Sequence, residues 1–186
     1  MESDENKIIA LTGDEFLRIG EVVEYLLNRG DSSDTPEFVI FMGGIASGKT
    51  TIRHKDYAGG FVHFDFGEIY KEIEDEFGKG EPRLAEYASF ASNTILREAL
   101  KRKKNIVIEI IGETQEPIGL VIDKMREVGY KISVQGITCD VKEAYARHIK
   151  ATQEDKDYIS AHYSQRPTLA EFYTYFGLGE LPVSIE

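Results

Sequence analysis

The residues best suited to chemistry form a glycine-rich segment that matches the pattern G-x-x-x-x-G-K-[ST]. The segment reads Gly43-Gly44-Ile45-Ala46-Ser47-Gly48-Lys49-Thr50-Thr51. Glycines in this pattern let backbone N–H groups turn inward around phosphate oxygens, and the helix that follows presents its positive N-terminal end to the same anion. Lys49 is expected to reach the β- and γ-phosphates of a nucleotide, and the Thr50 hydroxyl is expected to ligate Mg²⁺. We therefore predict that residues 43–51 bind nucleotide phosphates.

A candidate general base is Asp65, which follows the short apolar segment 61–64. Ligands of open α/β sheets bind beyond the carboxyl ends of the strands, so Asp65 is expected to face the phosphate loop. A carboxylate there can accept the proton of a hydroxyl that attacks the γ-phosphate. The spacing from Asp65 to Glu68 is also typical of a helix N-cap. Both interpretations of Asp65 remain open at this stage.

A further acid, Glu109, ends the apolar run that begins at Asn105. This pattern is similar to a Walker-B element, whose carboxylate orients Mg²⁺, often through water. Direct contact with a substrate is an equal alternative, and an acid at the end of a strand can also have no functional role. Glu113, four residues later, is a weaker candidate for contact with the substrate.

Phosphoryl transfer also needs positive charge near the leaving and transferred oxygens. Arg147 and Arg166 lie in a helical region that follows the last predicted strand, and residues 141–167 are predicted to form a lid over the nucleotide. In that position the two arginines are candidates for phosphate contacts. The alternative for each is an ordinary solvated arginine on the surface.

Strands and helices that alternate along the chain would position these residues. Thr12 and Glu15 have the spacing of a capping box at the start of a helix that ends near Gly30. Apolar runs predict strands at 37–42, 61–64, 106–110 and 131–138, and helical periodicity predicts helices near 66–77, 82–103, 116–128, 141–152, 155–164 and 168–176. A fifth strand is absent or confined to 181–185. The pattern predicts one α/β domain over residues 1–186, a three-layer α/β/α P-loop NTPase of the nucleotide-kinase type with a mostly parallel sheet and a helical lid.

The composition limits the classes of partner. The chain of 186 residues holds 22 Lys and Arg against 33 Asp and Glu, a net charge of −11. Such an acidic surface disfavours extended nucleic acid and anionic membranes, and no apolar run approaches the roughly 18 residues of a membrane span. The single cysteine, Cys139, and the lack of a signal-peptide pattern favour a cytoplasmic location.

Taken together, the order of these motifs resembles the zeta toxin family of P-loop kinases. The resemblance covers roughly residues 12–176 and rests on VIFMGGIASGKTT, HFDFGEIY, NIVIEIIGET and GYKISVQGITC, followed by a helix with Arg147. It implies transfer of phosphate from ATP or GTP to the 3′-hydroxyl of UDP-N-acetylglucosamine, and it implies an antitoxin protein as a partner.

The resemblance also implies roles for individual residues. Asp65 corresponds to the family's proposed catalytic base, and Lys49 and Thr50 correspond to the phosphate-loop lysine and the Mg²⁺ hydroxyl. Glu109 corresponds to an acid that touches the sugar nucleotide. Arg147 and Arg166 correspond to two lid arginines that grip phosphates.

Two departures from the family pattern concern the acceptor. Members commonly carry an arginine shortly after the third-strand acid, where this chain has Gly112 and Glu113, and the chain is shorter than many members at its C-terminal end. An acid at that place should weaken the binding of a diphosphate. A kinase for nucleosides, nucleotides or other small molecules, and a nucleotide-binding module without catalysis, are therefore the alternative functions.

Overall fold

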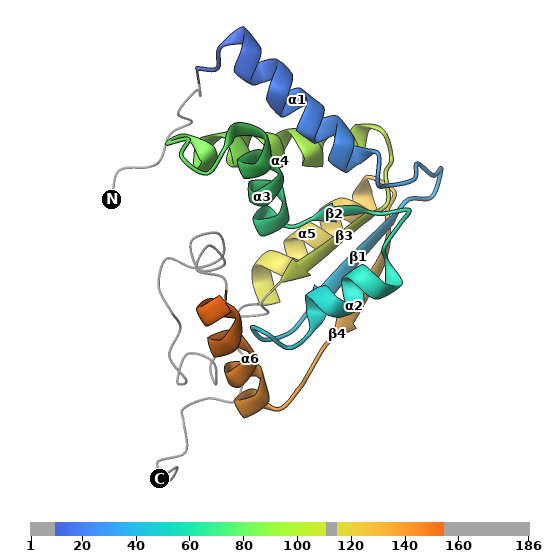
Figure 1. The fold of residues 1–186 in the computed structure, drawn as a ribbon. Coiled ribbons are helices and arrows are strands. Elements are labelled where there is room, and N and C mark those ends of the chain that lie inside the picture. Colours follow the sequence, from blue (N-terminus) through green and yellow to red (C-terminus); the bar gives the residue numbers. More distant parts are fainter. Residues whose placement is uncertain (1–9, 111–114, 155–186) are drawn as a thin grey trace, which may run out of the picture.

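The computed structural model describes residues 10–110 and 115–154, which form four strands and six helices (Figure 1). In chain order the elements are α1 (Gly13–Leu27), β1 (Glu37–Met42), α2 (Lys49–Asp56), β2 (Val62–Phe64), α3 (Phe66–Phe77), α4 (Leu84–Lys101), β3 (Ile106–Ile110), α5 (Gln115–Glu127), β4 (Lys131–Gly136) and α6 (Val141–Glu154). All four predicted strands and the helices predicted up to residue 152 are confirmed. The predicted helices at 155–164 and 168–176 and the segment 181–185 lie outside the described residues.

The strands form one parallel sheet with the order β2-β3-β1-β4. Strand β1 lies between two partners, with Phe38 opposite Ile106 of β3 on one side and Ile132 of β4 on the other. Four consecutive residues of β1 are buried. The continuous apolar run 37–42 therefore belongs to a strand covered on both faces, as expected for a parallel sheet.

Helices cover both faces of the sheet, and Figure 1 shows α2 in front of it and α5 behind it. Successive side chains of a strand point to opposite faces. Accordingly, Phe38 and Ile40 pack in a large core with residues of α1, α3, α4 and α5. Val39 and Phe41 pack on the other face with Ile52 of α2. This arrangement confirms the predicted three-layer α/β/α fold.

The predicted start of the first helix is also confirmed. The Thr12 hydroxyl accepts from the Glu15 backbone N–H at 3.2 Å, and the Glu15 carboxylate accepts from the Thr12 backbone N–H at 2.7 Å. This capping box satisfies two N–H groups that the helix itself cannot. The capping box fixes where α1 begins, and α1 contributes five buried apolar residues to the large core.

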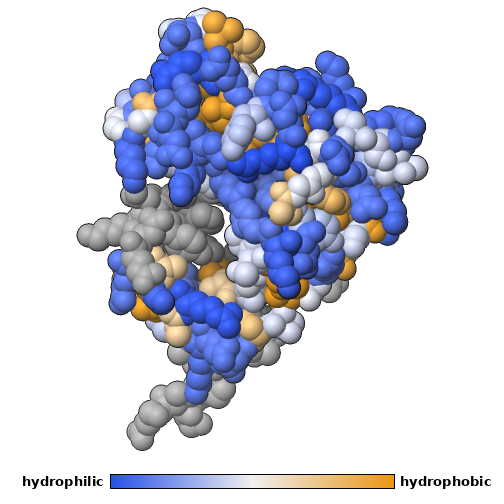
Figure 2. All heavy atoms as spheres, turned by 45° about the vertical axis from the view of Figure 1, so that its right-hand side comes forward, coloured by the Kyte–Doolittle hydropathy of each residue, from blue (hydrophilic) through white to orange (hydrophobic). Residues whose placement is uncertain are grey.

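One face of the molecule is predominantly hydrophilic, with apolar side chains in small separate areas (Figure 2). This surface agrees with the high content of charged residues, 30% of the chain. Among the described helices, none combines the length and the apolar character that crossing a membrane requires.

Two glycines provide a matched test of the packing. A Cβ on Gly20, inside α1, would meet nothing within 4 Å, so Gly20→Ala should raise the free energy of unfolding by about 0.5–1 kcal/mol. A Cβ on Gly30 would lie 2.7 Å from the Val62 backbone nitrogen, so Gly30→Ala should lower it by about 1–3 kcal/mol. Chemical denaturation measures both changes. Shifts of the same sign would contradict the described packing.

Candidate active site

The phosphate loop lies between the end of β1 and the start of α2. Two of its residues have positive φ angles, Ala46 at 55° and Gly48 at 102°. Gly43 leaves no room for a side chain, because a Cβ there would lie 2.3 Å from the Ile137 carbonyl oxygen. Glycine is therefore required at Gly43 by the close approach of the chain after β4 and favoured at Gly48 by its backbone angle.

Lys49 folds back onto the loop that precedes it. Its ammonium donates to the carbonyl oxygens of Gly43 at 2.9 Å and Gly44 at 2.7 Å, and the residue is 7% exposed. Burial lowers the pKa of Lys49, while the negative charges of Glu109 and Asp65 act in the opposite direction. The Lys49 ammonium thus lies among backbone groups of the loop, and binding of phosphate there stays a prediction of the sequence motif.

A buried arginine on α2, which none of the sequence motifs includes, contacts the acids of the site. The Arg53 side chain is 1% exposed. Its guanidinium donates to Glu109 at 2.6 Å and to Glu68 at 2.5 Å, and it lies 3.9 Å from an Asp65 oxygen. Burial opposes the charged form, but the interactions with Glu68 and Glu109 raise the pKa of Arg53 above its ordinary value. One signal was present, since Arg53 follows Lys49 by four residues and so shares its helix face.

The Asp65 side chain caps α3. Its Oδ1 accepts from the Glu68 backbone N–H at 3.0 Å, so the helix-cap interpretation of the sequence is confirmed. The other oxygen, Oδ2, faces Arg53. The two carboxylate oxygens therefore have different partners: Oδ1 caps the helix, and Oδ2, which faces the guanidinium, takes no part in the cap.

Glu109 connects the end of β3 to the phosphate-loop helix. Its Oε2 accepts from the Thr50 hydroxyl at 2.9 Å, while Oε1 accepts from Arg53. The carboxylate thus lies directly beside the hydroxyl that the motif assigns to a metal ion. A hydroxyl and a carboxylate are oxygen ligands of the kind that Mg²⁺ prefers, so the donor set fits this ion.

Arg147 projects from α6 toward the phosphate loop. It donates to the Ala46 carbonyl oxygen at 3.3 Å and pairs with Glu143 at 3.0 Å, and its side chain is 51% exposed. The start of α6 is held against the loop, because Val141 and Ala144 pack on Ile45. Arg147 is therefore placed near the site, whereas Arg166 and Glu113 lie outside the described residues.

These side chains share one cleft of about 1240 Å³. Its lining includes ten of the predicted residues, namely loop residues 45–51 with Asp65, Glu109 and Arg147. The cleft lies at the carboxyl ends of β1, β2 and β3, where open α/β sheets bind their ligands.

The sequence model described as zeta toxin matches residues 24–168. The chain belongs to the zeta toxin family. The matched range holds the phosphate loop, the ends of β2 and β3, and Arg147, so it includes every residue of the cleft discussed above. No curated protein matches the chain.

Solved structures have the same fold as this zeta toxin family member at low sequence identity. One is from the PezAT chromosomal toxin–antitoxin system of Streptococcus pneumoniae, with 19% identity and a TM-score of 0.58 over 82% of this chain and 68% of that one. Another is AvrRxo1-ORF1:-ORF2 with ATP, with 16% identity and a TM-score of 0.60 over 87% and 55%. A candidate kinase from Chloroflexus aurantiacus gives 14% identity and a TM-score of 0.53 over 80% and 82%. The chain spans 68% of the first structure's chain and about half of the AvrRxo1 chain.

The buried arginine can be tested by a change that removes its charge. Arg53→Met leaves Glu68 and Glu109 without their guanidinium, so we expect the free energy of unfolding to fall by about 3–5 kcal/mol. The matched control, Arg147→Met, alters a half-exposed arginine in the same cleft and should change stability by less than about 0.5 kcal/mol. Chemical denaturation curves of the two variants measure both changes in the free energy of unfolding. Equal losses of stability in the two variants would contradict the role given to Arg53.

Proposed function

We propose that this zeta toxin family member is a kinase that transfers the γ-phosphate of ATP or GTP to a hydroxyl group of a small molecule. The observation that carries the proposal is the common cleft of Lys49, Thr50, Asp65 and Glu109. A phosphate cradle, a metal-binding hydroxyl, a candidate base and a metal-orienting acid are the parts that phosphoryl transfer requires. The likeness to a structure that was solved with ATP supports a nucleotide ligand.

The phosphate loop would bind and orient the nucleotide. Its N–H groups and the N-terminal end of α2 would hold the phosphates, and Lys49 would exchange its bonds to the Gly43 and Gly44 carbonyls for phosphate oxygens. Thr50 and Glu109 would hold Mg²⁺, which neutralises charge on the phosphate oxygens when it is bound. Arg147 would add positive charge from α6, in the lid region 141–167 that the sequence predicts.

Asp65 would act on the acceptor. As the acceptor oxygen attacks the γ-phosphorus, its proton would pass to Oδ2 of Asp65, the oxygen that does not cap α3, while the new O–P bond forms and the bond to the leaving diphosphate breaks. The cap bond between Oδ1 and the Glu68 backbone N–H holds the carboxylate in a fixed orientation. Arg53, 3.9 Å from Oδ2, would help to hold the carboxylate in place, which is a positioning role rather than contact with the substrate.

For the acceptor, we propose a nucleotide sugar, with UDP-N-acetylglucosamine as the first to test. Ligand sites for single small molecules commonly enclose about 300–1,000 Å³. The cleft of about 1240 Å³ exceeds that range, which supports two ligands side by side. The family commonly has an arginine close to the position of Glu113. An acid there disfavours a strongly anionic acceptor, so nucleosides and small alcohols should be tested in the same panel.

We also propose an antitoxin protein as a partner. The support is the family membership and the likeness to the structure from the PezAT toxin–antitoxin system. Co-expression with the product of a neighbouring gene, followed by co-purification, tests this proposal independently of catalysis.

The catalytic assignments can be tested with two substitutions. Asp65→Asn removes the base while asparagine remains a good helix cap, so stability should be nearly unchanged. Lys49→Ala removes the phosphate-loop cation. Each variant is expected to lower the rate of phosphate transfer by about 10²–10⁴-fold, measured with radiolabelled ATP and the acceptor panel.

The control is Asp75→Asn, which alters an exposed acid in the same cleft and should keep full activity. Full activity of Asp65→Asn would show that another group accepts the proton. Tight ATP binding with no transfer to any acceptor would instead favour the alternative of a nucleotide-binding module.

The role of Glu109 can be separated from direct contact with the acceptor. Because Glu109 bonds to the Thr50 hydroxyl, Glu109→Gln should raise the Mg²⁺ concentration needed for half-maximal rate by roughly tenfold, as expected for a group that orients a metal ligand. The KM for the acceptor at saturating Mg²⁺ should change little. A raised KM with an unchanged Mg²⁺ requirement would assign Glu109 to the acceptor.

A further inference from the structure

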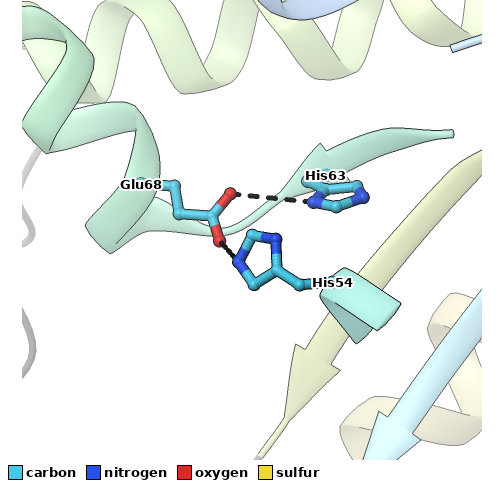
Figure 3. Close-up of side chains that lie close together, drawn as sticks. All are labelled: His54, His63 and Glu68. Atoms are coloured by element: carbon cyan, nitrogen blue, oxygen red, sulfur yellow. Dashed lines mark ion pairs between the residues drawn. The ribbon is translucent and has the colours of Figure 1, made fainter. Parts of the chain in front are cut away.

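Beside the catalytic cleft, three side chains from three elements converge on one point (Figure 3). His54 belongs to α2, His63 to β2 and Glu68 to α3. The His54 Nε2 lies 2.8 Å from Glu68 Oε1, and the His63 Nδ1 lies 3.8 Å from Glu68 Oε2. One donor atom from each residue falls within 4.8 Å of the other two.

The hydrogen bonding of His63 leaves a lone pair directed at this point. His63 Nε2 lies 2.6 Å from the Tyr57 carbonyl oxygen, and a carbonyl can only accept, so Nε2 carries the proton. In the neutral ring Nδ1 is then an acceptor. His63 is 6% exposed, and its Nδ1 has no hydrogen-bond partner. Two acceptors, this nitrogen and the Glu68 carboxylate, therefore face each other at 3.8 Å, an arrangement that a cation between them would stabilise.

The local charges favour a cation. Arg53 lies among three carboxylates, those of Asp65, Glu68 and Glu109. The one positive charge of Arg53 against three carboxylates leaves two negative charges in excess. Lys49, which lies nearby, reduces this excess to one negative charge. A divalent ion beside Glu68 would thus enter a negative environment even though Arg53 is near.

The donor set is that of a transition-metal site. Two imidazole nitrogens and one carboxylate oxygen bind zinc in proteins, and a water molecule completes the tetrahedron. Zinc bonds of about 2.0–2.1 Å at tetrahedral angles place two donor atoms about 3.3 Å apart. The separations of 2.8 Å from His54 Nε2 to Glu68 Oε1 and of 3.8 Å from His63 Nδ1 to Glu68 Oε2 involve the two carboxylate oxygens and lie on either side of this value. The bond from His63 Nε2 to a backbone carbonyl is also the usual outer contact of a metal-bound histidine.

We propose that His54, His63 and Glu68 form a binding site for a divalent transition-metal ion, with zinc the favoured occupant. The site is separate from the Mg²⁺ ligands proposed at Thr50 and Glu109, and it uses nitrogen donors that Mg²⁺ does not favour. The half-exposed His54 side chain leaves the site open to solvent, so an ion can enter. A bound ion would tie the phosphate-loop helix to the start of α3, which carries Asp65 at its cap.

The test is metal binding by the full chain, independent of any kinase assay. Chelator-treated protein in excess Mg²⁺, which fills oxygen sites, is titrated with Co²⁺ and followed by its visible absorption, and then with Zn²⁺ by calorimetry. We expect one ion per chain and a zinc-dependent rise in melting temperature. His54→Ala, at a half-exposed position where folding should be kept, and Glu68→Gln should each weaken binding by more than the roughly tenfold loss typical of outer contacts.

Two control variants separate this site from others. His162→Ala removes one histidine outside the described residues, and Thr50→Ala removes the proposed Mg²⁺ ligand; both should bind Zn²⁺ as the unmodified chain does. Unchanged affinity in His54→Ala would overturn the proposal, as would an equal loss in His162→Ala. Failure of the unmodified chain to bind Co²⁺ or Zn²⁺ would overturn it as well, while leaving the proposed kinase activity untouched.

Discussion

The arrangement of the cleft depends on one buried guanidinium. Arg53 belongs to α2, the helix that follows the phosphate loop, and contacts acids at the end of β3 and at the start of α3. A buried arginine without these partners would be strongly destabilising, and the acids without it would repel one another. The three carboxylates therefore occupy their positions together. Since Asp65 and Glu109 are two of them, the distance between the candidate base and the candidate metal-orienting acid is set by Arg53.

Local patterns predicted most of the fold and part of the site. The run 37–42, the glycine-rich loop and the capping box at Thr12 each have a signature within a few residues, and the structure confirms each of them as an element. Arg53 and the histidine cluster were not predicted, because their partners lie on other helices and strands. Arg53 and Glu109 are separated by 56 residues, and only the register between β1 and β3 brings them together.

The net charge of −11 has a more specific meaning once the acids are located. Many acidic side chains are exposed, as expected of a solvated surface, but Glu68 and Glu109 are largely covered and bonded to Arg53. Burial alone would raise the pKa of the Glu68 carboxyl, yet the hydrogen bonds that it accepts and the positive charge of Arg53 lower it to about 2. The acids around Arg53 thus leave this part of the site negative, which favours cations there, whereas Lys49 and the N-terminal end of α2 face the place proposed for the phosphates.

The strand order also has a consequence for how the molecule forms. The central strand β1 is made early, but its partners in the sheet follow 68 residues later in β3 and 94 residues later in β4, counting from Phe38 to Ile106 and Ile132. Contacts between such distant segments slow folding, because a long loop must close before any of them forms. During synthesis the phosphate loop therefore emerges well before the sheet that supports it. The cleft lining extends to Ala151, so the cleft is completed only when about four fifths of the chain is present.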